Sequence, residues 1–178
     1  MAPTPLLKID TPTGTVTPGR GFYQLEDDLL YVQIGEYSDA RRFFNYLESD
    51  SVRLDIDRHG RLMLIEVSVS RRQWQVQEGL TASGIGERAD IHWLDFREAI
   101  PDPVLLTNER RTELLIRFLP SDSWRWYVIA DSVLVQTDEH DHLTAIMITD
   151  IEDDLAGQAI GAYRKQVCRP KDDDHIEQ

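Results

Sequence analysis

The sequence has almost no cysteine and no long apolar run, and each shortage excludes a class of protein. Its single cysteine, Cys168, cannot form an intramolecular disulfide or a cysteine-rich zinc site, and it suits a reducing compartment. No apolar stretch approaches the roughly 18 residues that a membrane-spanning helix needs. Proline and threonine interrupt residues 1–21, so no export signal is visible. These observations predict a cytoplasmic protein without a membrane partner.

Basic residues are also scarce. Lysine and arginine number 19 against 32 aspartates and glutamates, which gives a net charge of −13. Arginines do pair at 41–42, 71–72 and 110–111, but acids lie near each pair. Such a molecule repels phosphate backbones, so we expect no binding to nucleic acid. With 178 residues and 41% hydrophobic residues, the chain is long and apolar enough to form one domain with a sizeable core.

The residue patterns of common catalytic and nucleotide-binding sites are missing as well. There is no Gly-x-Ser-x-Gly elbow, phosphate-binding glycine loop or His-Glu-x-x-His motif. Residues 55–66 have the spacing of a calcium loop, but their alternating polarity favours a β-hairpin turn. Asp138, His140, Asp141 and His142 favour a solvated turn over a metal site, because neighbours on a tight turn rarely converge. We therefore predict no catalytic residue, no metal and no cofactor.

An internal repeat is the most informative feature of the sequence. Residues 50–70 and 131–151 align without a gap, and seven of these 21 positions are identical. Residues 30–34 and 114–118 correspond upstream. Within each copy, apolar and polar residues alternate on both sides of a short turn, which indicates antiparallel strands. Each copy is thus predicted to form a four-stranded antiparallel meander.

The expected fold is mainly β, with both meanders sharing one core as a sandwich or a barrel-like structure. One C-terminal helix would cap the sheets. Within one compact domain, the expected segments are an extended lead-in at 1–21, a first repeat at 22–70, connecting strands and a loop at 71–103, a second repeat at 104–151, the helix at 152–168 and a frayed acidic tail at 169–178.

The residue pattern of the repeat is similar to a known one. Residues 28–32 read Asp-Leu-Leu-Tyr-Val, and residues 50–67 contain Asp-x-Asp-x-x-Gly-x-Leu followed by Ile-Glu-Val. The second copy has Asp141 and Met147 in place of Gly60 and Glu66. Over about a quarter of its length the chain resembles a duplicated version of a family of short bacterial proteins of unknown function. The resemblance implies a bacterial origin and a β-hairpin repeat, and it implies no catalytic residue.

Four tryptophans are the candidates for contact with a ligand or a partner. Trp124 and Trp126 fall on one face of an expected strand, and Trp74 and Trp93 lie on strand candidates between the repeats. Together they would line an apolar cleft, or they would fill the core between the two repeats. The sequence leaves both alternatives open.

A non-enzymatic binding or protein-interaction module is the function that requires least beyond these features. Open sheet edges recruit strands, so we expect a protein partner or a homodimer formed through a sheet edge. One alternative is a small-ligand carrier with a tryptophan-lined cavity. Another is a hydrolase that uses His92, His140 or Cys168.

Overall fold

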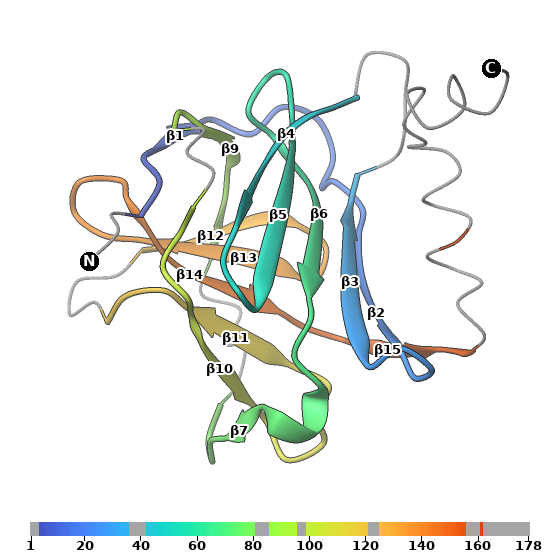
Figure 1. The fold of residues 1–178 in the computed structure, drawn as a ribbon. Coiled ribbons are helices and arrows are strands. Elements are labelled where there is room, and N and C mark those ends of the chain that lie inside the picture. Colours follow the sequence, from blue (N-terminus) through green and yellow to red (C-terminus); the bar gives the residue numbers. More distant parts are fainter. Residues whose placement is uncertain are drawn as a thin grey trace, which may run out of the picture.

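The fold is described by a computed structural model for residues 4–35, 42–80, 86–95, 99–120, 125–155 and 161 (Figure 1). Within these ranges the chain is mainly β, as predicted, and its strands form sheets of six, seven and two strands. The helix expected at 152–168 is not confirmed. Its first three residues form strand β15 (Glu152–Asp154), and most of the rest lies outside the described ranges.

The six-stranded sheet is built mainly from the first repeat. Its spatial order is β15-β2-β3-β6-β5-β4. The five strands besides β15 are antiparallel to their neighbours and comprise β2 (Gly19–Gln24), β3 (Leu29–Ile34), β4 (Phe43–Glu48), β5 (Val52–Asp57) and β6 (Leu62–Val67).

The seven-stranded sheet contains the second repeat in the same arrangement. Its order is β7-β10-β11-β14-β13-β12-β8. Its strands are β7 (Gln75–Val76), β8 (Glu87–Arg88), β10 (Val104–Thr107), β11 (Leu114–Arg117), β12 (Arg125–Ala130), β13 (Val133–Thr137) and β14 (Leu143–Ile148).

The predicted meander order is wrong in both repeats. In the predicted four-stranded meander β3 would pair with β5, and β4 is not expected, but β3 pairs with β6 and β11 pairs with β14. Burial explains the difference: all six residues of β14 and five of the six residues of β6 are buried, so these strands take central positions. The less buried β4 and β12 are displaced outward, and each repeat forms a five-stranded unit.

The two units are interlocked. Strand β7 follows the first unit but pairs with β10 of the second, and β15 follows the second unit but pairs with β2 of the first. Strands β1 (Leu7–Asp10) and β9 (Asp90–Trp93), which precede the two units, pair with each other. Each unit is therefore completed by a strand that belongs, in sequence, to the other.

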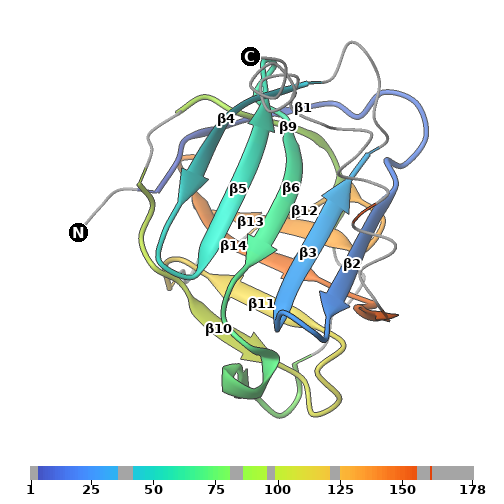
Figure 2. The ribbon, with the colours of Figure 1, turned by 45° about the vertical axis from the view of Figure 1, so that its right-hand side comes forward.

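The two large sheets stack face to face, and their strands cross at a steep angle (Figure 2). One apolar cluster fills the space between them and includes Leu54 and Ile65 from one sheet and Ile116 and Val135 from the other, all fully buried. Alternate residues along each strand supply this cluster. Both sheets remain open, so the structure does not close into a barrel.

Both repeat hairpins end in the same tight turn. The Asp57 carboxylate accepts hydrogen bonds from the backbone N–H groups of His59 and Arg61, each at 2.9 Å. The Asp138 carboxylate accepts the corresponding bonds from His140 and His142, also at 2.9 Å. Both aspartates thus stabilise a hairpin turn, the structure favoured by the sequence over a calcium loop.

Candidate functional site

Two of the candidate tryptophans lie in the core between the sheets. Trp74 is 2% exposed and Trp93 is 1% exposed. The indole Nε1 of Trp74 donates to the carbonyl of Val69 at 3.0 Å, and its ring contacts Tyr23 edge to face. Both side chains therefore fill the core between the sheets and do not line a cleft.

The other two tryptophans are not brought to the same place. Trp126 is half-buried on the outer face of the seven-stranded sheet, against a cluster that includes Leu106, Leu115 and Met147. Trp124 lies outside the described residues. The pockets described below are lined by other side chains, and a tryptophan-lined cavity stays a prediction.

Of the two described histidines proposed for a hydrolase, His92 lies on strand β9 and His140 lies in a hairpin turn. His92 Nδ1 is 2.7 Å from the carbonyl oxygen of His59, whereas His140 is exposed on the turn of the second unit. Within the described ranges, no hydrogen bond or ion pair joins these two histidines. The two described histidines are not assembled into one site, and the prediction for Cys168 falls outside the described residues.

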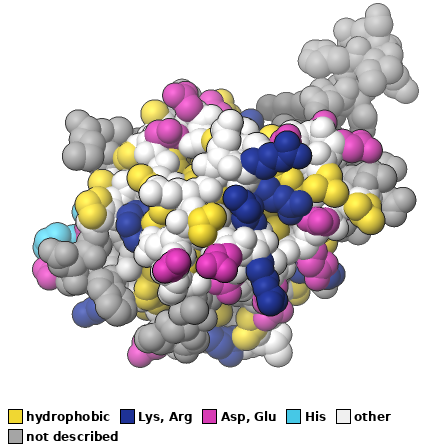
Figure 3. Space-filling model, turned by 90° about the horizontal axis from the view of Figure 1, so that it is seen from below, with side chains coloured by type: hydrophobic (Ala, Val, Ile, Leu, Met, Phe, Trp, Pro, Cys, Tyr) yellow, Lys and Arg dark blue, Asp and Glu magenta, His cyan; other side chains and the backbone are white. Residues whose placement is uncertain are grey.

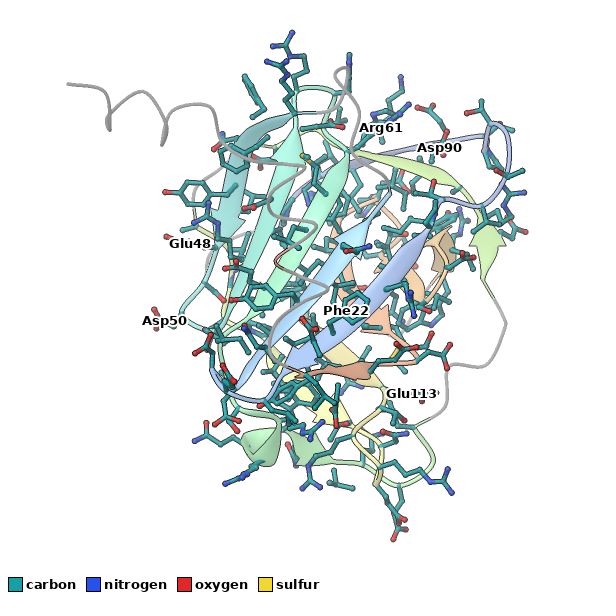
Figure 4. All side chains as sticks on the ribbon, turned by 90° about the vertical axis from the view of Figure 1, so that its right-hand side faces the viewer. Phe22, Glu48, Asp50, Arg61, Asp90 and Glu113 are labelled. Carbon is teal, nitrogen blue, oxygen red and sulfur yellow. The ribbon has the colours of Figure 1, made fainter. Side chains whose placement is uncertain are left out.

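Two further pockets lie away from the site considered below. A small pocket of about 100 Å³ is lined by Arg61, Asp90 and apolar side chains, and Figure 4 shows this pair at the end of the molecule opposite to Glu113. An acidic pocket of about 450 Å³ is lined by Glu48, Asp50 and Asp102, the last of which accepts a hydrogen bond from the hydroxyl of Ser51. Within the described part of the chain, no group of three or more histidine, cysteine, aspartate or glutamate side chains is placed to hold a metal ion.

A third pocket, which we call the arginine pocket, concentrates positive charge in this acidic protein. It has a volume of about 380 Å³ and is lined by Arg71, Arg110, Arg111, Thr112, Ile151 and Asp153. Figure 3 shows lysine and arginine side chains gathered, with acidic neighbours, on the face below the sheets in Figure 1. Three arginines and one aspartate give the pocket a net charge of +2, whereas the whole chain carries −13.

Two loops from different units form the pocket. Arg71 begins the short 3-10 helix η1 (Arg71–Gln73) after the first unit, and Arg110 and Arg111 lie in the turn between β10 and β11. The pairing of β7 with β10 holds the loops side by side, supported by a bond from the Gln77 N–H to the Thr107 carbonyl. The arginine pocket is thus a product of the interlocked strands.

Arg71 is held in position by two side-chain contacts and one backbone contact. Its guanidinium stacks over the Tyr23 ring at 4.4 Å, and its Nη1 is 2.7 Å from Asp153 Oδ1. Its backbone N–H donates to the Tyr23 hydroxyl at 3.1 Å. A guanidinium that is already ordered loses little further rotamer entropy when it binds a ligand.

Arg111 has an unusual backbone conformation. Its φ is +56°, a left-handed value that costs a residue with a long side chain more than it costs glycine. The turn is stabilised by Asn108, whose side-chain oxygen accepts from the N–H groups of Thr112 and Glu113. The Arg111 Nε donates to the Arg71 carbonyl at 3.1 Å, so it joins the two loops directly.

Only a weak signal for this site is present in the sequence. The pairs 71–72 and 110–111 are visible as basic doublets, but Arg71 and Arg110 are about 40 positions apart and acids surround each doublet. Only the swapped pairing of β7 with β10 places them together. To predict the site, one would have had to know that β7, which follows the first unit, pairs with β10, the first strand of the second unit.

Comparisons with known proteins give no independent indication of function. No family model matches the chain, and no curated protein matches it. In the part of the chain that the structure describes, no helix has the length and apolar character needed to cross a bilayer. The geometry of the arginine pocket is consequently the main guide to function.

Proposed function

We propose that this protein is a binding module that recognises a negatively charged ligand in the arginine pocket and has no turnover of its own. The observation that carries the proposal is the convergence of Arg71, Arg110 and Arg111 from two units in a chain of net charge −13. Guanidinium groups bind carboxylates and phosphates through paired hydrogen bonds. A local positive field in an acidic protein directs an anion to this place.

The residues that line the pocket favour binding over catalysis. Asp153 is already paired with Arg71, and the hydroxyl of Thr112 accepts a hydrogen bond from the Asn108 side chain at 2.9 Å. Among the residues that the structure describes, no histidine, serine or cysteine lines this pocket. A nucleophile with an adjacent base and an orienting partner, which hydrolysis of the acyl-transfer kind requires, is therefore missing from its lining.

Calorimetric titration with a panel of anions tests this function. Inorganic phosphate, citrate and hexaglutamate would be titrated into the wild-type protein and into the double variant Arg110→Gln/Arg111→Gln in 50 mM salt. We expect at least one anion to bind the wild type and to bind the double variant at least tenfold more weakly. Absence of binding by the whole panel would refute the proposal, and so would chemical conversion of a bound anion.

A second candidate function is self-association through β4. Among the described edge strands, β4 has six residues whereas β7, β8 and β15 have two or three, and Phe44 on β4 is 58% exposed. The edge is partly protected, because the Asn45 side chain accepts the Tyr46 N–H at 2.8 Å and the Glu48 carbonyl accepts from Ile100.

The variant Asn45→Ala tests this second candidate. It frees the Tyr46 N–H and should raise the dimer fraction measured by light scattering across a concentration series. The matched control Asn108→Ala removes an asparagine from a turn and leaves this edge unchanged. An Asn45→Ala variant that scatters like the wild type at every concentration would count against association through β4.

We also propose that the two units descend from a duplicated ancestral unit. Their common strand order and matching aspartate turns support this origin. A bacterial source and a cytoplasmic location likewise remain proposals, based on the resemblance of the repeat and on the single cysteine.

A further inference from the structure

We infer that the anion bound in the arginine pocket is the phosphate group of a phosphomonoester. This inference rests on the proposed function and narrows it from anions in general to one chemical class. It depends on four features of the pocket, which are its charge, its hydrogen-bond donors, its apolar wall and the strained backbone of Arg111.

The charge of the pocket matches a dianion. The three arginines and Asp153 sum to +2, and a phosphomonoester carries about −1.5 to −2 near neutral pH. A single carboxylate would leave one positive charge uncompensated. Because exposed charges beyond about 8–10 Å are screened at physiological salt, the remaining acids of the chain oppose binding only weakly at contact distance.

The donors come from different directions, as a tetrahedral group requires. Arg71 approaches from η1, fixed by Tyr23 and Asp153, and Arg110 and Arg111 approach from the β10–β11 turn. Thr112 adds a hydroxyl: its oxygen already accepts from Asn108, so its own proton is available for a ligand oxygen. Arginine and hydroxyl donors from two loops suit the several oxygens of a phosphate better than the two coplanar oxygens of a carboxylate.

Ile151 gives the pocket one apolar wall, and it is 7% exposed. Its N–H donates to the Thr112 carbonyl at 2.9 Å, which fixes this wall beside the β10–β11 turn. A phosphomonoester has a carbon-bearing side that can contact such a wall, whereas inorganic phosphate has none. A volume of about 380 Å³ lies at the lower end of small-molecule sites, which agrees with a small ligand.

The conformation of Arg111 indicates that its side chain is kept for binding. The other described non-glycine residues with positive φ are three aspartates and a serine, and aspartate tolerates this region better than arginine does. Glycine at 111 would relieve the backbone but would remove the guanidinium. Strain retained at one such position is typical of functional sites.

Asp153 provides a prediction with a definite sign. Its carboxylate pairs with Arg71 and would repel a bound dianion, so Asp153→Asn should tighten phosphate binding about threefold or more. Arg71 would stay ordered because it still stacks on Tyr23. A pocket in which the Arg71–Asp153 pair served only the fold would show no such gain.

The decisive experiment uses two arginines that differ only in their place. Arg110 and Arg72 are both exposed and both lie in the two loops, but only Arg110 lines the pocket. Calorimetry with glycerol phosphate should show binding to the wild type, at least tenfold weaker binding to Arg110→Gln, and less than a twofold change for Arg72→Gln. Equal effects of the two variants would overturn the inference, because they would indicate attraction by overall charge.

Further probes separate the inference from the proposed function and identify the source of the phosphate. If hexaglutamate binds and glycerol phosphate does not, the phosphate inference fails and the proposed function stands; if neither anion nor citrate binds, both fail. Tighter binding of glycerol phosphate than of a phosphoserine peptide supports a small phosphorylated molecule. The reverse order supports a phosphorylated protein side chain, which carries the same chemistry.

Discussion

The two five-stranded units have the same strand order but opposite charges at one corresponding turn. Between β2 and β3 the chain reads Glu26, Asp27, Asp28, whereas between β10 and β11 it reads Glu109, Arg110, Arg111. The strands must supply one shared core, so their apolar pattern is constrained. An exposed turn has no such constraint, and the difference between the units shows where a repeated fold can acquire a binding site.

The hairpin turns at 57–61 and 138–142, unlike the β2–β3 and β10–β11 turns, are alike in the two units. They keep the same side-chain hydrogen bonds, and both have a left-handed residue at the fourth position, Gly60 with φ +78° and Asp141 with φ +63°. Each turn also accepts a bond from the small sheet, because Trp93 donates to the Gly60 carbonyl and Leu7 donates to the Asp141 carbonyl. These turns hold the interlocked units together, so their geometry is retained.

Among the substitutions that would make the two hairpin turns differ, Gly60→Ala should reduce the free energy of unfolding the most. A Cβ at Gly60 would lie 2.5 Å from the Trp93 carbonyl oxygen, in addition to the cost of a left-handed alanine. We expect a loss of about 3 kcal/mol in the free energy of unfolding, measured by urea denaturation.

Gly14→Ala is the matched control for this variant. Gly14 has φ +74° but open space around its Cβ position, so this substitution should cost only about 1 kcal/mol. Asp141→Gly, which gives the second turn the residue of the first, should be neutral or slightly stabilising. Equal losses for Gly60→Ala and Gly14→Ala would show that the contact with Trp93 is not tight.

Removing the turn aspartates should cause the next largest loss of stability. The loss should differ between the two units, because one aspartate is more buried than the other. Asp57 is 1% exposed, whereas the Asp138 side chain is 31% exposed. Asp57→Ala removes a buried carboxylate that accepts from two backbone N–H groups of the turn, so we expect a loss of about 2–3 kcal/mol. Asp138→Ala should cost about 1 kcal/mol, since water can replace the carboxylate there.

Thermal and urea unfolding of both variants would measure this difference. The controls Asp57→Asn and Asp138→Asn retain an acceptor oxygen and should lose less than the alanine variants. A larger loss at Asp138 than at Asp57 would contradict the assignment of burial as the cause.

Local patterns in the sequence were sufficient to predict most strands of the repeats, but not β4 and not the order of the strands. Alternation identifies residues 52–57 and 62–67 as strands, and Asp57 with Gly60 identifies the turn between them. Strand β4 lies at an edge because β6, which buries more of its side chains, occupies the central position beside β3. Which strand takes the central position depends on the whole sheet and cannot be predicted from one strand alone.

The arginine pocket was not predictable for a related reason. Strands β7 and β15 have only two and three residues, too few for a periodic signal, yet their exchange between units brings Arg71 to Arg110 and Asp153. The tryptophans gave a stronger signal in sequence, but Trp74 and Trp93 are used in the core. Rare residue types mark packing as readily as they mark binding.

The smallest expected effects concern two ion pairs that involve neighbouring residues of β15. Arg20 pairs with Glu152 at 3.0 Å, and both side chains are more than half exposed. Arg71 pairs with Asp153 at 2.7 Å, its side chain is 27% exposed, and it also stacks on Tyr23. Double-mutant cycles with Arg20→Gln/Glu152→Gln and Arg71→Gln/Asp153→Asn would compare the coupling free energies of the two pairs.

We expect a coupling below about 0.5 kcal/mol for Arg20–Glu152, because water and salt screen exposed pairs. The coupling of Arg71–Asp153 should reach about 1 kcal/mol, since stacking on Tyr23 restricts the arginine before it meets the carboxylate. Raising the salt concentration from 0.05 to 0.5 M should reduce the first coupling proportionally more than the second. Equal couplings with equal salt dependence would mean that Tyr23 does not order Arg71, and the pocket would then lose a preorganised guanidinium.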